Sequence, residues 1–234
     1  MLMTCRAVAV CGLLLLSSAV SGQGVPLKRN VSDFHSEGIG LTETLLKFSH
    51  QEHFPIAIEY VDRASLDNPI KVSLRNTTIR QGLNAILLQS QGCRWRLHNG
   101  IVEITNEHAR EGGEDWLRKV IPVFEIKEQT TAIWASVLLR QSLQMVLDPR
   151  IKGFAGDIMG PLGPPTLKPV TLHNRTVEEI LSYIVVHSGA EGWTVAGPPE
   201  YLARNPQSGL WNIIAQGPSA ESYQVVLRII RQNF

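Results

Sequence analysis

The 234-residue sequence has few cysteines, no block of like charges and no long apolar stretch beyond its N-terminal segment. Two of its three cysteines, Cys5 and Cys11, fall in a segment that we expect to be removed. Cys93 is then the single thiol of the exported chain, which excludes an intramolecular disulfide. Stability must therefore come from burial of an apolar core and not from covalent cross-links.

The sequence lacks the signals that are typical of several functional classes. No five consecutive residues carry the same charge, so a nucleic-acid footprint or a polybasic membrane patch is not supported. Without Arg6, which lies in the segment expected to be removed, the chain balances 21 basic residues against 21 acidic ones. No P-loop, G-x-S-x-G or dinucleotide fingerprint occurs, so the sequence names no reaction and no cofactor.

The N-terminus has the pattern of a signal peptide. Met1–Arg6 gives a short positive region, residues 7–17 are apolar, and Ala19-Val20-Ser21 places small residues before a cleavage point. The apolar run covers about 14 residues, short of the roughly 20 that a membrane helix needs. We therefore expect an exported protein of the periplasm or cell envelope, with no stable membrane span after removal of the segment. Retention of the segment as an anchor is the alternative.

A stretch of 24 residues occurs twice, at 72–95 and, 98 residues later, at 170–193. The ungapped copies share eight identities. The identical pairs are Val72/Val170, Leu74/Leu172, Asn76/Asn174, Thr78/Thr176, Leu83/Leu181, Ile86/Ile184, Ser90/Ser188 and Trp95/Trp193. Because repetition at a fixed spacing indicates duplicated structural units, the sequence predicts two similar units in tandem.

Each copy has the pattern of a strand, a turn and a capped helix. In the first copy residues 71–74 are strand-like, and the side chains of Asn76 and Thr78 can accept backbone N–H groups at a helix start. Apolar residues then recur at helical spacing over 79–87. Asn99-Gly100, the preferred pair for a type I′ turn, lies between two strand-like segments and predicts a β-hairpin over 94–104.

The remaining segments give further expectations. Residues 31–36 suggest a first strand that Gly38 and Gly40 break, followed by a helix capped by Thr42. In the second unit we expect a strand over 120–126, a helix that begins after Thr130/Thr131, and a further strand over 143–147. Residues 193–195 and 210–214 are expected to form the closing hairpin. Over 223–230 we expect a last helix that carries apolar residues at helical spacing. A strand over the same residues is the alternative.

Together these elements resemble a known family, the secretin and TonB N-terminal short domain (STN). Both copies fit its pattern, VSLRNTTIRQGLNAIL in the first and VTLHNRTVEEILSYIV in the second. The resemblance implies a small α+β module in which two helices sit between two small sheets, and which contacts other proteins in the periplasm. The chain departs from the family in that no secretin or outer-membrane barrel sequence follows its second unit, so the resemblance does not extend to a channel or transducer role.

The sequence therefore predicts an α+β protein of two tandem small domains, each with two helices packed against two small β-sheets. The expected division is 1–22 signal peptide, 27–108 first STN-like domain, 109–119 linker, 120–216 second STN-like domain and 217–234 C-terminal extension.

The second unit differs from the first by two longer loops, 153–168 and 196–209, both rich in Gly and Pro. Loops of this length in a compact domain are usually functional or mobile. We take them as the candidate contact surface for a partner, with tolerated surface insertion as the alternative. The candidate contact residues are Phe154, Ile158, Met159, Tyr201 and Leu202.

Other polar residues are candidates for chemistry. His50 and His53 are three apart near a helix end, which is not the zinc pattern H-E-x-x-H, so we expect a solvated helix terminus. Glu178 and Glu179 are expected on the exposed side of a first helical turn, where acids favour the helix dipole. Cys93 is expected to be a small buried hydrophobe beside Trp95. We predict no catalytic, cofactor or metal residue.

The resulting functional prediction is an exported, non-enzymatic envelope protein that acts by protein–protein contact, linked to secretion or TonB-dependent systems. The predicted partner is an envelope protein and not a nucleic acid. The sequence leaves the formation of a homo-oligomer open. The alternative is a module that binds a small ligand or glycan, stacking it on Trp193, Trp211 and Tyr201. A third hypothesis is a hydrolase with a dispersed site, in which substitution of His50 or Cys93 would remove turnover.

Overall fold

The computed structural model describes residues 25–61, 63–90, 92–106, 116–148, 166–196 and 212–214. The predicted signal peptide and C-terminal extension lie outside these ranges. Helices and strands occur in similar proportion within them, which confirms the predicted α+β class. No helix in these ranges combines the length and apolar character that crossing a bilayer requires.

The elements follow the order of the two repeats. Those of the first repeat are β1 (Phe34–Gly40), α1 (Leu41–Gln51), β2 (Ile56–Val61), α2 (Arg63–Asp67), β3 (Pro69–Leu74), α3 (Ile79–Leu87), β4 (Cys93–His98) and β5 (Ile101–Asn106). Those of the second are the 3-10 turn η2 (Trp116–Arg118), β6 (Val120–Ile126), α4 (Ala132–Leu147), β7 (Val170–Thr176), α5 (Val177–Ser188), β8 (Gly192–Ala196) and β9 (Asn212–Ile214).

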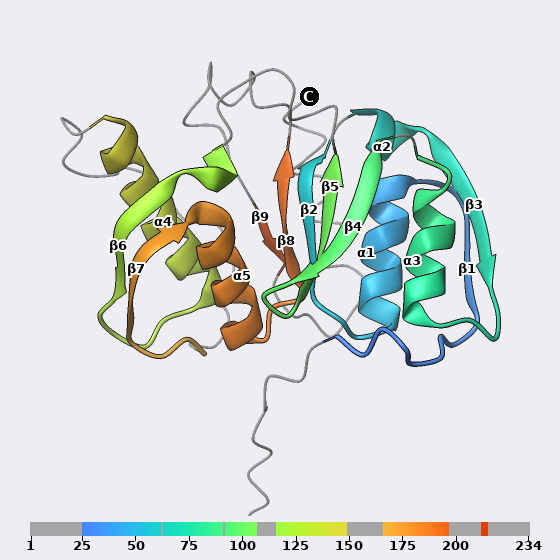
Figure 1. Ribbon diagram of the computed structural model, residues 1–234, viewed down its shortest axis with the longest axis horizontal. Coiled ribbons are helices and arrows are strands. Elements are labelled where there is room, and N and C mark those ends of the chain that lie inside the picture. Colours follow the sequence, from blue (N-terminus) through green and yellow to red (C-terminus); the bar gives the residue numbers. More distant parts are fainter. Residues whose placement is uncertain are drawn as a thin grey trace, which may run out of the picture.

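These elements stack in five layers (Figure 1). A five-stranded sheet with the order β4-β5-β2-β8-β9 stands in the middle. Helices α1 and α3 lie between this sheet and the outer pair β1-β3, and helices α4 and α5 lie between it and the outer pair β6-β7. Each repeat therefore has two long helices between two sheets, as predicted, but the first repeat carries the short helix α2 in addition, and one of the sheets is common to both repeats.

The repeats join through β2, which pairs in parallel with β5 of its own repeat and with β8 of the other. In the second pairing Ile56, Ala57 and Ile58 stand opposite Gly192, Trp193 and Thr194. The approach at Gly192 is so close that a Cβ there would lie 1.9 Å from the carbonyl oxygen of Ile56. Glycine is thus required where the two repeats meet. The division into two domains stays a prediction.

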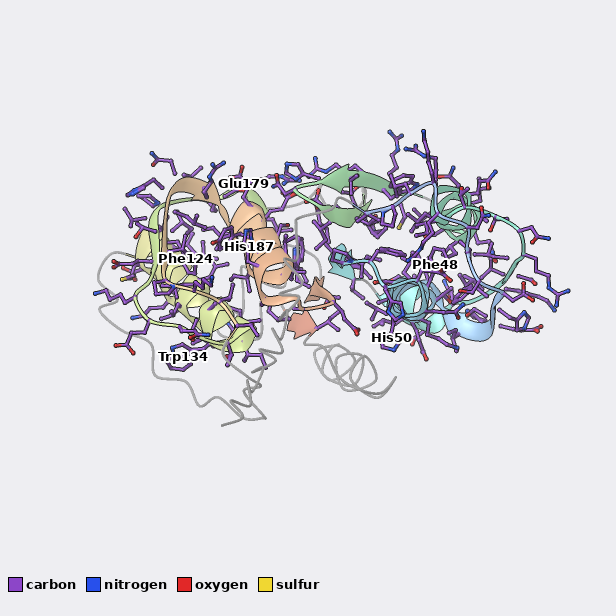
Figure 2. All side chains as sticks on the ribbon, turned by 90° about the horizontal axis from the view of Figure 1, so that it is seen from below. Phe48, His50, Phe124, Trp134, Glu179 and His187 are labelled. Atoms are coloured by element: carbon purple, nitrogen blue, oxygen red, sulfur yellow. The ribbon has the colours of Figure 1, made fainter. Side chains whose placement is uncertain are left out.

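The inner strands β2, β5 and β8 of the central sheet are buried on both faces, and their side chains alternate between two apolar clusters. Ile56 and Ile58 belong to the cluster of the first repeat, whereas Ala57 between them belongs to that of the second. This alternation follows from the two-residue period of a strand. Phe48 and Phe124 lie in opposite halves of the molecule, each within its own cluster (Figure 2).

The identities of the repeat are explained by local structure. Thr78 and Thr176 are the N-caps of α3 and α5, and each forms a capping box with the residue three positions on. Asn76 and Asn174 adopt positive φ angles of 52° and 51°, a conformation that asparagine tolerates better than most residues. The predicted caps are confirmed in both copies. Leu83, Ile86 and their counterparts Leu181 and Ile184 are fully buried core residues.

The two predicted hairpins are also confirmed. Strands β4 and β5 pair antiparallel around Asn99 and Gly100, whose φ angles of 51° and 80° are the positive values that a type I′ turn needs. Strands β8 and β9 form the closing hairpin of the second repeat.

Three local predictions were wrong. The first strand is not broken by its glycines, because a bulge between Glu37 and Ile39 lets β1 continue to Gly40. That glycine, and not Thr42, is the N-cap of α1. The strand expected over 143–147 is the last part of α4, which is one helix of 16 residues. An apolar run can be a buried helix or a strand, and periodicity alone does not separate the two.

Candidate functional site

The open edge of the central sheet offers the most exposed apolar surface of the first repeat. In the part of the chain that the structure describes, β4 pairs with β5 alone, so one side of β4 has no strand beside it. A groove of about 630 Å³ lies between this strand and the end of α3. Its lining residues are Asn84, Leu87, Leu88, Ser90, Cys93, Arg94 and Trp95. We call this the β4 groove.

Two large apolar side chains dominate the β4 groove. Leu88 follows α3 directly and is 86% exposed, the highest value among the large hydrophobic residues described. Trp95 is half-buried on β4 and packs against the first core. Its indole Nε1 donates a hydrogen bond of 2.7 Å to Asn84 Oδ1, and the Arg80 guanidinium lies 5.3 Å from its ring centroid. The ring is therefore held in place with part of its surface accessible.

The equivalent tryptophan of the second repeat is in a different environment. Trp193 donates its Nε1 to Ser182 Oγ at 3.3 Å, and Ser182 is the residue equivalent to Asn84. The local bond is thus the same in both copies, yet Trp193 is 0% exposed. Strand β8 has β9 on one side and β2 on the other. The side of β4 that corresponds to the β2 side of β8 has no strand beside it among the described residues.

Beside β4 lies a cluster of ionisable side chains in which the two repeats meet. Three glutamates, Glu59 on β2, Glu103 on β5 and Glu178 on α5, are almost completely buried. The cationic side chains are Arg96 and Arg118, and His98 completes the group. Burial of a charge is costly unless the charge is paired and hydrogen-bonded, so this pairing is required for the fold.

Some pairs of this cluster lie within one repeat, and others, such as Arg96 with Glu178 and Arg118 with Glu59, cross between repeats. Arg96 donates from Nε to Glu103 Oε2 and from Nη2 to Glu178 Oε1, each at 2.5 Å. Arg118 contacts Glu178 directly and reaches Glu59 Oε1 at 3.4 Å. Because Glu178 comes from the second repeat and Arg96 from the first, these contacts fix α5 against the central sheet. We call the group the inter-repeat charge cluster.

Three members of the cluster have the composition of a metal site. One ligand atom each of His98, Glu103 and Glu178 lies within 4.8 Å of the others. Both carboxylates already bind a guanidinium, and His98 Nδ1 is 2.9 Å from Glu103 Oε1. A cation would have to displace these groups. The arrangement therefore fits a structural ion-pair network better than a metal centre.

The histidines singled out in the sequence also link the repeats. His50, at the end of α1, has its Nδ1 2.9 Å from Glu191 Oε1 of the second repeat. Its ring centroid is 6.5 Å from that of His53. Neither histidine belongs to a group of three metal-ligating side chains in the described ranges. The terminus of α1 is thus an inter-repeat contact, and the prediction of a solvated helix end was wrong for His50.

A second groove, of about 390 Å³, lies between α5, β7 and the Asn99 turn. Tyr183 and His187 stack on one of its walls, with ring centroids 3.9 Å apart and planes 20° apart. His187 Nδ1 lies 2.9 Å from the carbonyl oxygen of Tyr183. Glu179 and His187 both project from α5 (Figure 2), and Glu179 pairs with Arg175 at 3.3 Å.

The structure describes only some of the candidate residues that the sequence indicates. Phe154, Ile158, Met159, Tyr201, Leu202 and Trp211 lie outside the described residues. Trp193 is buried and presents no stacking surface. Glu179 lies on a partly exposed helical turn and completes a capping box, but the expected exposure of Glu178 was wrong. Packing of α5 against the other repeat buries that side chain. Cys93 is partly buried beside Trp95 and accepts a hydrogen bond of 3.4 Å from Ser90.

Sequence reasoning missed the β4 groove and the charge cluster. Arg118 had been placed in the predicted linker, yet it contacts buried carboxylates, and the neighbouring Leu117 is a core residue. The alternation Arg94-Trp95-Arg96 is the available signal for the groove, because charged residues are frequent on edge strands. This alternation does not show which strand of the sheet lies at the edge.

Comparison of the chain with protein-family models, with curated proteins and with solved structures gives no match.

Proposed function

We propose that this protein is an exported, non-enzymatic component of the cell envelope that binds another protein through its β4 groove. The observation that carries the proposal is the exposure of Leu88 and Trp95 beside a strand that, among the described residues, has a neighbouring strand on one side only. Exposed apolar surface next to ordered polar groups is typical of protein-interaction sites. Tryptophan and arginine are the residues most often found at the energetic centre of such sites.

The resemblance to STN modules supports the same proposal, because those modules contact other proteins in the periplasm. Under this proposal the partner is an envelope protein of a secretion or TonB-dependent system. The charge cluster has a supporting role, since it fixes the position of β4 relative to the second repeat through Arg96.

Site-specific cross-linking in the native envelope tests the proposal. A photoreactive residue at position 88 should give one discrete adduct, and the same residue at the 80% exposed Lys127 should give none. Once the adduct is identified by mass spectrometry, the purified partner should bind the protein. Trp95→Ala should weaken this binding by about 30-fold, the effect of removing an anchor residue. Equal labelling from both positions, or binding unchanged in Trp95→Ala, would contradict the proposal.

The second groove favours a second candidate function, binding of a small ligand or glycan. Its stacked Tyr183 and His187 rings stand beside the charged pair Arg175 and Glu179, which is the mixture of apolar and polar groups found in ligand sites. A sugar or amino acid that binds there should raise the melting temperature of the purified protein. The shift should be absent in Tyr183→Ala. A panel that produces no shift in the unmodified protein would remove this candidate.

A further inference from the structure

The face of α5 that lines the second groove differs from the matching face of the first repeat. On α5 the groove is lined by Glu179, Tyr183 and His187, which recur at every fourth position and so share one face of the helix. The residues 98 positions earlier in the chain are Gln81, Ala85 and Gln89. The second repeat thus has a carboxylate and two aromatic rings where the first has two amides and a methyl group.

The fold of the repeat does not require these side chains. Glu179 completes the capping box of α5, but Gln81 completes the equivalent box of α3 without a charge. Arg175, which pairs with Glu179, stands in the place of Thr77. A helix with the same cap and an equivalent core stripe forms in the first repeat without the charged pair and the rings. These groups therefore point to a role that is particular to the second groove.

The groove offers both donors and acceptors to a ligand. Glu179 accepts the N–H of Thr176 at 2.9 Å on one oxygen and the Arg175 guanidinium at 3.3 Å on the other, and each oxygen keeps a further lone pair. The Arg175 side chain is 56% exposed. His187 donates from Nδ1 to the carbonyl oxygen of Tyr183, so Nε2 is the acceptor of the neutral ring.

We infer that the second groove binds a neutral sugar ring. This inference rests on the second candidate function, ligand binding at this groove, and names the class of ligand. Glu179 repels a ligand carboxylate, which also competes with it for Arg175, and a ligand ammonium competes with Arg175 for Glu179. Two neighbouring hydroxyl groups avoid both conflicts, because one donates to Glu179 while the other accepts from Arg175. The ion pair of the protein then stays formed.

The apolar part of the groove fits the same ligand. The rings of Tyr183 and His187 are 3.9 Å apart and nearly parallel, and the half-buried Leu172 and Val186 also line the groove. The C–H groups on one face of a pyranose ring pack against such a wall, while its hydroxyl groups reach the polar side chains. The volume of about 390 Å³ suits one or two sugar units, since ligand sites cover about 300–1,000 Å³.

The ligand contacts both repeats. The Asn99-Gly100 turn of the first repeat closes the groove against α5, and a Cβ added at Gly100 would lie 3.7 Å from Val186 Cγ2. The side-chain amide of Asn99 supplies one more donor and acceptor. Sugar binding should therefore depend on Asn99 as well as on α5. Asn99→Gly removes the amide but tolerates the positive φ of 51° that the turn needs.

NMR titration of the purified full chain tests the inference. The probes are the methyl glycosides of glucose, galactose, mannose and N-acetylglucosamine, together with disaccharides of these sugars. At least one should shift the amide signals of Tyr183, His187 and Asn99 saturably. The uronic acid and the amino sugar of the same configuration should bind about tenfold more weakly, because each introduces one of the charge conflicts.

Variants that restore the residues of the first repeat locate the bound sugar. Tyr183→Ala should weaken binding about tenfold, since it removes the stacking surface, whereas Tyr183→Phe keeps the ring and should change the affinity little. Arg175→Thr should also weaken binding, as should Asn99→Gly. Trp134→Ala is the matched control, because it removes a 42% exposed aromatic ring from α4 and should leave sugar binding unchanged.

Three results would overturn the inference. These are the absence of a saturable shift with every neutral sugar, tighter binding of the uronic acid or the amino sugar, and sugar binding that Tyr183→Ala leaves unchanged. If a charged ligand such as an amino acid raises the melting temperature of the unmodified protein but not of Tyr183→Ala, the second candidate function stands and only the ligand class is refuted. If no ligand of either kind binds, both fail together, and the proposal for the β4 groove is tested separately by its cross-link.

Discussion

Replacing Arg118 with methionine should lower the free energy of unfolding by about 3–5 kcal/mol. The variant removes the guanidinium that both Glu59 and Glu178 contact, while methionine keeps most of the volume of the side chain. Glu178 keeps its pair with Arg96 but loses its second guanidinium, and Glu59 loses the contact at 3.4 Å, so less of the cost of burying the two carboxylates is compensated. Urea unfolding of the two proteins measures the difference.

Two further variants distinguish the loss of a buried pair from a general effect of removing arginine. Arg175→Met breaks the partly exposed pair with Glu179 and should cost less than about 1 kcal/mol. Adding Glu178→Gln to Arg118→Met should recover part of the loss, so that the two substitutions are not additive. Equal losses in Arg118→Met and Arg175→Met would mean that the cluster does not hold the repeats together.

Truncation of the two equivalent tryptophans should destabilise the protein to very different extents. Trp193→Ala should destabilise the protein by about 3–5 kcal/mol, since it opens a cavity in the second core at the position where β8 meets β2. Trp95→Ala should cost only about 1 kcal/mol, because the ring is half-buried at the border of its core. Thermal or urea unfolding measures both.

Partner binding should show the reverse order. Trp95→Ala removes the anchor of the β4 groove from a folded protein, so partner binding weakens by about 30-fold while the melting temperature changes little. Trp193→Ala lowers stability but leaves the groove intact in the fraction that remains folded. A Trp95→Ala variant as unstable as Trp193→Ala would show that Trp95 is mainly a core residue.

The features that the sequence predicted well depend on neighbours in the chain. The capping boxes at Thr78 and Thr176 and the turn at Asn99-Gly100 are decided by residues only a few positions apart. Short-range hydrogen bonds and backbone preferences are visible in the residue types themselves. The α+β class followed from these local elements. The strand expected over 143–147 was wrong because a buried helix and a buried strand share the same apolar composition.

The candidate site could not be predicted because it depends on pairing between distant segments. Parallel strands carry no local signal for their partner, so the contact of Ala57 with the strand of Trp193 is absent from the pattern of either segment. That pairing decides which hairpin strand stays at the edge. It also buries Glu178, since only the assembled sheet brings Arg96 to it. The sequence showed two equivalent tryptophans. The shared sheet buries Trp193 and leaves Trp95 partly accessible.

The pairing of β2 with β8 also sets an order on folding. The first repeat can form β2, β5 and β4 from contacts within its own length, whereas β8 needs a strand that lies in the other repeat. Contacts between residues far apart in sequence form slowly, because the entropy of closing the intervening chain must be offset first. We expect the first repeat to be the template on which the second completes its sheet. During synthesis this order is also the order in which the two repeats leave the ribosome.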